Sequence, residues 1–357
     1  MSRLRRYIPR RVIRTVRNLQ QRAQVRAIRR AHAQAKTAAP APLLPTALVI
    51  PVHNDAIRLA RLLDTASAMG FAQIIVVDDG SDLPVVIGAG IPNVTLIRHD
   101  TPRGPGAART TGTAQVTAPY LIYLDSDDLP TAELPPLLAD LARQPAFDVC
   151  LYKHIDSHIA NSGHWGQSPA DEAHWSAAGV AIGALQEAPR AVWPELAQIA
   201  NYPWNKVYRT AFLREHDIRC ADTPVHQDIT LHWLTFLHAQ RLLTSDRTCV
   251  WHMIADGANR LTNRTGPERL RVFEALAPIV AANPPPDMAV ALTRFVLTLS
   301  DWIRSVLDQV HLPAFESALT HWLKDTIAGW HTQIEASDPA LMAQIKTQIK
   351  TQITDHP

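Results

Sequence analysis

The sequence predicts an α/β fold with a doubly wound, mostly parallel sheet, helices on both faces and an added C-terminal all-helical region. Between residues 46 and 154, short apolar runs alternate with helical patterns. From about residue 256 the patterns become longer and purely helical. Strands separated by helices are typical of a parallel sheet, whose strands are buried on both faces.

The elements follow from the local pattern in chain order. Five apolar runs predict strands, at residues 46–51, 73–81, 94–99, 120–128 and 147–154. Helical spacing between them predicts helices at residues 56–70, where Gly70 ends the pattern, and 106–117. Further along, residues 266–282, 289–310 and 315–336 show apolar residues at helical spacing. We therefore expect a sheet domain at residues 46–255 and a helical region at 256–357.

A basic segment precedes this body. Residues 1–36 contain 12 Lys/Arg and no Asp or Glu, which leaves 23 basic against 33 acidic residues in the rest of the chain. Their apolar residues share one helical face, so residues 1–45 predict an amphipathic arm followed by a Pro-rich linker. Such an arm suits an anionic membrane surface; a solvated arm and a nucleic-acid-binding arm are the alternatives.

Cysteine usage and hydropathy suggest a cytoplasmic protein. The three cysteines are an odd number without a CxxC pair, which argues against a disulfide framework or a zinc ribbon. We also expect no secretory signal and no membrane span, because no segment has the uninterrupted apolar length that a span requires. We expect the protein in the cytoplasm, where the basic arm would attach it peripherally to the inner face of the membrane.

Acidic residues follow three of the predicted strands. The strands end in PVHND (51–55), DDGSD (78–82) and DSDD (125–128). Because ligands of doubly wound sheets bind beyond the carboxyl ends of the strands, these acids are expected to meet at one edge. Carboxylates gathered at close range repel one another unless a positive partner such as a hard divalent cation shares the site.

Four motifs, ALVIPVHN, IIVVDDGSD, RGPGAARTTG and YLIYLDSDDLP, resemble in order and spacing the family 2 glycosyltransferases with the GT-A fold, of the bacterial polysaccharide type. The resemblance covers roughly residues 46–255. It implies inverting transfer of a sugar from a nucleoside-diphosphate sugar, UDP-sugar by default, to a hydroxyl of a glycan or lipid-linked acceptor.

The resemblance also implies a nucleotide-sugar site. Its residues are Pro51, Asp78, Asp79, Arg109, Asp125 and Asp127. DSDD matches the DxD motif, so Asp127 would bind Mg²⁺ or Mn²⁺ while Asp128 supports or caps the next helix. The two acids after the second strand are equally compatible with an Asx turn, and the glycines before Arg109 with an ordinary start of a helix.

The acceptor half of the family is matched by NYPWNKVYR (201–209) and HQDITLHW (226–233). By this resemblance Asp228 is the general base that takes the acceptor proton, and Gln227 replaces the acid that usually precedes it. An N-cap role is the structural alternative for Asp228. Trp204, Asn205 and Lys206 would line the acceptor or sugar pocket. His252, 24 residues after Asp228, would be a further metal ligand.

Two other functions compete with glycosyl transfer. A nucleotidyltransferase would need a basic glycine-rich loop after the first strand, where this chain has PVHND. A non-catalytic protein that binds sugar nucleotides or a partner is the main alternative, with Gln227 marking a decayed acceptor site. The donor sugar, its base, the acceptor and the oligomeric state are not specified by the sequence.

Overall fold

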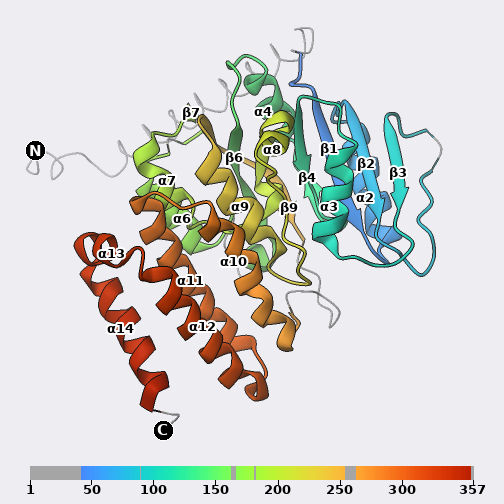
Figure 1. The fold of residues 1–357 in the computed structure, drawn as a ribbon. Helices are drawn as coiled ribbons and strands as arrows, with labels where there is room; N and C mark the ends of the chain where they lie inside the picture. The colour runs from blue at the N-terminus through green and yellow to red at the C-terminus, as the bar shows by residue number, and fades with distance from the viewer. Residues whose placement is uncertain (1–41, 89, 162–165, 181, 254–262, 355–357) are drawn as a thin grey trace, which may run out of the picture. The chain divides into compact units, whose positions relative to one another are not determined.

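The computed structural model describes residues 42–88, 90–161, 166–180, 182–253 and 263–354 (Figure 1). From Leu44 onward the chain forms one compact unit. The predicted amphipathic arm, residues 1–36, lies outside the described residues and stays a prediction. No helix in the described ranges has the length and apolar character needed to cross a membrane.

Four parallel strands form one half of the sheet. They are β1 (Thr46–Val52), β2 (Gln73–Asp78), β3 (Val94–Arg98) and β4 (Tyr120–Tyr123), in the spatial order β3-β2-β1-β4. Every residue of β1 is buried, as expected of a central parallel strand with an unbroken apolar run. The second and fourth strands end earlier than predicted, at Asp78 and Tyr123, so most of the acidic motifs lie in the loops beyond them.

The other half of the sheet is mixed. β8 (Lys206–Arg209) pairs antiparallel with β4 and with β6 (Val149–Asp156), and β6 runs parallel to β9 (Leu242–His252). Short strands β5 (Leu129–Pro130) and β7 (Leu185–Glu187) pair antiparallel with β9. In the described part of the chain the strands form one nine-stranded sheet. The predicted α/β class is confirmed, with parallel pairing concentrated in the first half.

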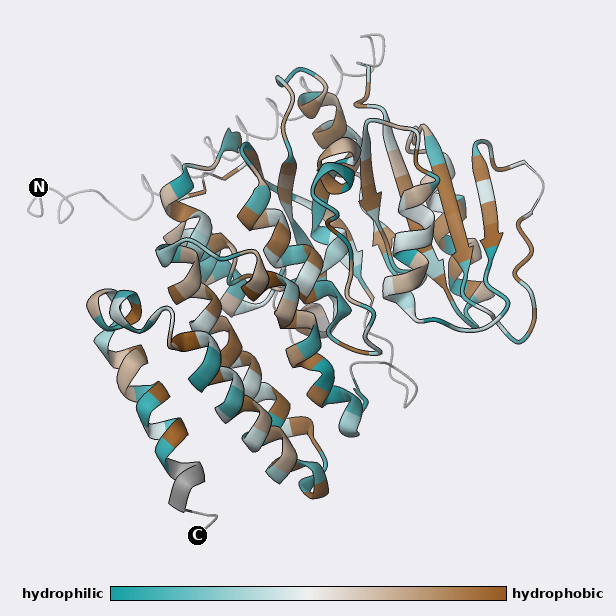
Figure 2. Ribbon diagram, in the orientation of Figure 1, coloured by the Kyte–Doolittle hydropathy of each residue, from teal (hydrophilic) through white to brown (hydrophobic). Residues whose placement is uncertain are grey.

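Helices cover the sheet, whose strands are strongly apolar (Figure 2). α3 (Pro105–Ala114) packs on β1 and β2, α2 (Ala56–Ser67) contacts β5, and α4 (Leu134–Leu141) contacts β9. Gly112 permits the close approach of α3, because a Cβ there would lie 2.5 Å from Val49 Cγ1. The other helices of this part are α5 (Ser157–Asn161), α6 (Pro169–Ala177), α7 (Trp193–Leu196), α8 (Thr210–Glu215) and α9 (Gln227–His238), with 3-10 turns at η2 (Arg190–Val192) and η3 (Pro203–Asn205).

The predicted C-terminal helical region is confirmed. It begins with the 3-10 turn η5 (Pro267–Arg271) and continues through α10 (Val272–Ala281), α11 (Pro286–Val306), η6 (Gln309–His311), α12 (Leu312–Ile327), α13 (His331–Ser337) and α14 (Pro339–Thr354). α10 packs against α9, and α11 against α7 (Figure 1). One hydrophobic cluster contains residues of the sheet, such as Val49, and of these helices, such as Leu292. The predicted boundary near residue 255 stays a prediction.

Candidate active site

A cavity of about 780 Å³ lies where the acidic loops after β1, β2 and β4 meet the beginnings of α3 and α9. Many of the residues predicted from sequence line it: Pro51, Asp79, Arg109, Asp125, Asp127, Trp204, Gln227, Asp228 and His252. These residues come from seven separate stretches of chain, so the fold brings the donor and acceptor motifs to one cavity. Asp78, Asn205 and Lys206, which were predicted with them, do not line it.

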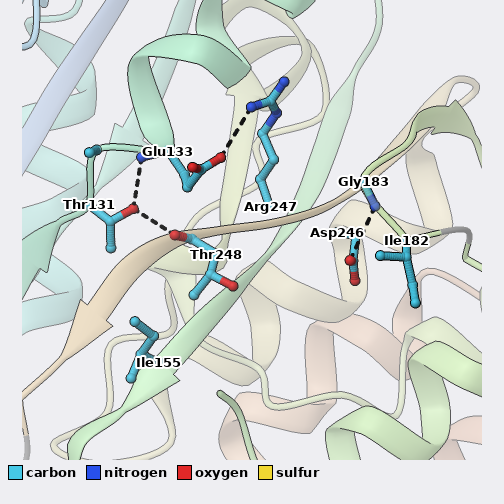
Figure 3. Close-up of a pocket in the computed structure, with 9 residues that line it drawn as sticks. Thr131, Glu133, Ile155, Ile182, Gly183, Asp246, Arg247 and Thr248 are labelled. Atoms are coloured by element: carbon cyan, nitrogen blue, oxygen red, sulfur yellow. Dashed lines mark hydrogen bonds and ion pairs between the residues drawn. The ribbon is translucent and has the colours of Figure 1, made fainter. Parts of the chain in front are cut away.

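A second cavity, of about 550 Å³, lies between β9 and the segment after β5 (Figure 3). Its charged groups are already paired: Glu133 binds Arg247 at 3.1 Å, and Asp246 binds Lys153 at 2.8 Å. None of the predicted site residues lines this cavity. We therefore take the larger cavity as the candidate active site.

Asp78 holds the loop after β2 and does not face the cavity. Its carboxylate accepts hydrogen bonds from the backbone N–H groups of Ser81, at 2.9 Å, and Val85, at 3.1 Å, and from the Arg98 guanidinium. Burial opposes ionisation of this carboxylate, but the hydrogen bonds outweigh it and lower the pKa of Asp78. The position fits the turn-stabilising alternative better than contact with a nucleotide.

Asp79 lines the cavity and also shapes the loop that enters it. Its two carboxylate oxygens accept the backbone N–H groups of Arg103, at 2.9 Å, and Gly104, at 2.7 Å. His99 Nδ1 lies 2.7 Å from Asp79 Oδ1. Gly104 adopts φ 93°, a conformation that suits glycine. Asp79 thereby fixes the N-terminus of α3 at the cavity.

The N-termini of α3 and α9 converge at the same place. Gly106 in the first turn of α3 packs against the segment before α9, and a Cβ at this position would lie 2.7 Å from the Ala221 carbonyl oxygen. Pro105 at the start of α3 and Gln227 at the start of α9 both line the cavity. Free N–H groups at helix N-termini favour anions, so this wall is suited to a diphosphate.

Arg109 is the buried cation of the site. Its Nη2 donates to Asp125 Oδ1 at 2.5 Å, whereas its Nε and Nη1 have no hydrogen-bond partner among the described residues. Burial works against the charge, but Asp125 outweighs it and raises the pKa of Arg109. The guanidinium thus stays charged, and its Nε and Nη1 carry three N–H donors that are buried in the wall of the cavity.

Asp127 belongs to a network that sequence reasoning did not identify. Arg58 Nη1 lies 3.6 Å from Asp127 Oδ2, and Arg58 Nε donates to Asp55 at 2.7 Å. Ser126 Oγ donates to the other oxygen of Asp55, also at 2.7 Å. Asp55 is the acid of the PVHND motif, which ends a strand beside the one that leads into DSDD. The neighbouring strand ends were therefore the signal for this network. The network orders the DSDD loop and neutralises part of its charge.

Asp128 does not cap the next helix, and this expectation was wrong. Its fully buried carboxylate accepts from His252 Nδ1 at 2.8 Å and from the Met253 N–H at 3.0 Å. Burial raises the pKa of Asp128 to about 6, with His252 opposing. Because Nδ1 of His252 is engaged by Asp128, its Nε2 is the nitrogen available to a ligand, as in carboxylate–histidine–metal arrangements.

Trp204 is the only member of the WNK motif that reaches the cavity, and it is buried there by other rings. It stacks on Tyr202, with centroids 4.3 Å apart, and on His252, at 4.8 Å. Asn205 and Lys206 turn away from the cavity and hold the loop: Asn205 Nδ2 donates to the Ala200 carbonyl at 3.0 Å, and Lys206 Nζ to that of Tyr202 at 2.8 Å. Their expected place in the pocket is therefore corrected to a supporting one.

The stacked rings of Tyr202, Trp204 and His252 form an aromatic wall of the cavity. Lys206, behind this wall, is fully buried. Its Nζ also donates to Asn205 Oδ1 at 2.5 Å. Burial lowers the pKa of Lys206 to about 7, and the carboxylates of Asp228 and Asp171 oppose the shift. The lysine therefore supports the wall through hydrogen bonds to oxygen atoms instead of contacting a ligand.

Asp228 lies in the first turn of α9 and lines the cavity. Burial raises the pKa of its carboxyl group to about 6, and the nearby Arg109 guanidinium opposes the shift. A carboxylate with a pKa near 6 is ionised at neutral pH and is a better proton acceptor than an ordinary aspartate. The neighbouring Gln227 adds no second negative charge beside it.

The donor groups fit a divalent cation that also binds the ligand. Asp127 and His252 both line the cavity and supply a carboxylate oxygen and an imidazole nitrogen. Within the described ranges, no three His, Cys, Asp or Glu side chains form a ready-made metal site. Mg²⁺ is commonly held by one or two carboxylates together with substrate phosphates, so two protein ligands are compatible with such a site.

Two arginines of the C-terminal region also line the cavity. Arg264 and Arg271 belong to the segment around η5, which was predicted to lie outside the catalytic domain. Arg271 Nη2 donates to the Asp222 carbonyl at 2.9 Å, so it also contacts the loop before α9. No motif in the sequence indicated this contribution, since the two segments are about 50 residues apart.

Comparisons with known proteins assign a family to part of the chain. Residues 47–185 match the sequence model of glycosyl transferase family 2. The pre-mycofactocin glycosyltransferase of Mycobacterium tuberculosis (strain ATCC 25618 / H37Rv) is 40% identical over 87 residues, 23% of this chain and 18% of that protein. The succinoglycan biosynthesis protein ExoO of Rhizobium meliloti (strain 1021) is 36% identical over 85 residues, 22% of this chain and 24% of that protein. The chain therefore spans between 18% and 24% of these curated relatives.

Solved structures extend the likeness beyond the family match. S. aureus TarS 1–349 in complex with UDP-GlcNAc superimposes with a TM-score of 0.66 at 16% identity, covering 86% of this chain and 89% of that one. The same protein in complex with UDP gives a TM-score of 0.62, covering 86% and 88%. At this identity the likeness shows the fold, which includes most of the helical region. Together these matches show a family 2 glycosyltransferase domain at residues 47–185, in a chain with the GT-A fold.

Proposed function

We propose that this protein is an inverting, metal-dependent glycosyltransferase that moves a sugar from a nucleoside-diphosphate sugar, UDP-sugar by default, to a hydroxyl of a glycan or lipid-linked acceptor. Polysaccharide biosynthesis is the proposed setting. The observation that carries the proposal is Asp228, whose carboxylate has a pKa of about 6 and lines the same cavity as Asp125, Asp127 and Arg109.

In the proposed reaction, the donor diphosphate lies against the N-termini of α3 and α9. Their N–H groups bind its oxygens, and the positive charge of the buried Arg109 guanidinium favours the diphosphate. Asp127 and His252 would hold Mg²⁺ or Mn²⁺, which when bound supplies Lewis-acid stabilisation of the leaving diphosphate. Asp125 remains tied to Arg109, which orients its second oxygen toward the ribose.

Asp228 acts on the acceptor. Its carboxylate accepts the proton of the acceptor hydroxyl while the hydroxyl oxygen attacks the anomeric carbon and the bond to the diphosphate breaks. A single displacement of this kind inverts the anomeric configuration. The stacked rings of Tyr202 and Trp204 line the cavity beside His252.

A thermal-shift panel tests the donor site. UDP, GDP, dTDP and CDP are each added with and without Mn²⁺ to wild type, Asp127→Ala and Glu133→Ala, which removes an acid from the second cavity. We expect one nucleotide to stabilise wild type and Glu133→Ala only with Mn²⁺, and not Asp127→Ala. Stabilisation that survives Asp127→Ala would contradict the assigned metal ligand.

Turnover is tested separately by release of the nucleoside diphosphate from its sugar donors in the presence of candidate acceptors. Metal-dependent nucleotide binding without release from any donor would favour the non-catalytic alternative. Membrane attachment is also part of the proposal: deleting residues 1–36 should abolish sedimentation with anionic vesicles. Unchanged sedimentation would remove the proposed peripheral location at the inner face of the membrane.

A further inference from the structure

The residue directly before α9 has an unusual backbone conformation. His226 adopts φ 62° and ψ 14°, in the left-handed region, and Gln227 and Asp228 follow it. Residues that carry a Cβ adopt this region uncommonly, so surrounding contacts must stabilise it. The direction in which α9 leaves His226 determines where the carboxylate of Asp228 enters the cavity.

The contacts around His226 come from the C-terminal helical region. Arg269 Nη1 lies 3.4 Å from His226 Nε2, and the Trp302 ring meets the imidazole at 90° with centroids 6.1 Å apart. A guanidinium can only donate, so His226 accepts at Nε2 through a long hydrogen bond and carries its proton on Nδ1. Burial, aided by Arg269, lowers the pKa of His226 to about 3, which keeps the imidazole neutral.

Arg269 is itself fixed in place. It is buried, its Nε donates to the Arg264 carbonyl at 2.9 Å, and its guanidinium lies 4.6 Å from the centroid of the Trp302 ring. A guanidinium at this distance from an indole face is attracted by the ring electrons. Arg269 does not line the cavity, so it does not act by touching the substrate.

A second link joins the same two segments. Thr230, in the first turns of α9, donates to the Ala275 carbonyl of α10 at 2.6 Å. The start of α9 is thus held from η5, α10 and α11, which lie beyond residue 185, where the match to the family ends.

We infer that Arg269, backed by Trp302, is a positioning residue for Asp228: it holds His226 in the left-handed conformation and so directs the first turn of α9 into the cavity. This inference rests on the proposed function for its catalytic consequence. Its structural part concerns the start of α9 alone and can be measured without turnover.

Arg269→Met tests the inference, with Arg304→Met as the matched control. Arg304 lies in α11 and pairs with Glu316 and Asp301 away from the cavity. We expect Arg269→Met to lower kcat at least tenfold while the Kd for the nucleotide with Mn²⁺ and the number of binding sites change less than twofold. Equal loss of kcat and of nucleotide-binding sites would mean general unfolding and would overturn the inference.

Hydrogen–deuterium exchange supplies the readout that does not need activity. Amides of residues 229–232 should exchange at least fivefold faster in Arg269→Met than in wild type or Arg304→Met. Unchanged exchange would overturn the inference even if kcat fell. If wild type transfers no sugar, the proposed function fails. Faster amide exchange in Arg269→Met would still support the role of Arg269 in holding the start of α9.

Substitutions of His226 separate backbone conformation from loss of a side chain. His226→Asn should retain activity within about threefold because asparagine tolerates the left-handed region, whereas His226→Val should lose at least tenfold. In the His226→Asn background, Arg269→Met should then cost less than it does in wild type. Equal losses for the asparagine and valine variants would contradict the conformational role.

Discussion

Replacing Asp228 by asparagine should remove activity and stabilise the protein. The pKa of this half-buried carboxyl group is about 6, against an ordinary value of 3.8. A difference of about two units corresponds to about 3 kcal/mol. Because the pKa is raised on folding, wild type loses this stability as the pH rises from about 4 to 6. Asparagine keeps a neutral side chain of the same shape and avoids the loss.

The stability of Asp228→Asn relative to wild type should therefore depend on pH. We expect the difference in unfolding free energy to be close to zero at pH 4 and to reach about 3 kcal/mol in favour of the variant at pH 7. Urea denaturation of both proteins across this range measures the difference. A variant that is less stable than wild type at pH 7 would refute the assigned burial cost.

Activity should change in the opposite direction. Loss of a general base costs about 10²- to 10⁴-fold in kcat. In wild type, kcat should fall about tenfold for each pH unit below 6, because only about a tenth of Asp228 is ionised at pH 5. The residual kcat of the variant should not show this fall below pH 6. The base assignment would be refuted if the variant kept more than a tenth of the wild-type kcat, or if its kcat still fell below pH 6.

Three further substitutions test the surroundings of the base. Arg109→Met should raise the pH below which kcat falls by about one unit, because the guanidinium opposes the rise in the Asp228 pKa. An unchanged pH profile of kcat would count against that coupling. Gly106→Ala should destabilise the protein by about 1–3 kcal/mol and lower kcat, while Gly88→Ala, where a Cβ meets nothing within 4 Å, should match wild type in thermal unfolding and rate. Asp128→Asn should weaken Mn²⁺ binding about tenfold in a titration, and unchanged affinity would argue against its hold on the imidazole.

The first half of the fold was predictable because its signals are local. Continuous apolar runs identify the buried parallel strands, and the acids that follow them mark the edge where the cavity lies. β8 was harder to identify because it has only four residues and follows a 3-10 turn. Its antiparallel pairing with β4 depends on contacts about 90 residues apart, which no local pattern encodes.

The sequence motifs located several residues that line the cavity, whereas partners that depend on long-range contacts could not be read from the sequence. Asp128 was expected to cap a helix, yet its partner His252 lies 124 residues away in sequence. In the WNK motif, spacing alone could not show that Trp204 faces the cavity while Lys206 supports the wall from behind. The direction of each side chain is set by how the η3 turn leads into β8.

The charges around Asp228 explain how a half-buried carboxylate can stay ionised at neutral pH and so serve as the proposed base. Burial alone would raise its pKa further, whereas a strong ion pair would make it a poor proton acceptor. Arg109 donates its short hydrogen bond to Asp125 and not to Asp228. Its positive charge nevertheless lowers the pKa of Asp228 and so opposes part of the effect of burial. An acid in place of Gln227 would oppose Arg109 and raise the pKa further. The glutamine therefore favours a carboxylate that remains ionised at neutral pH, as the proposed base must be.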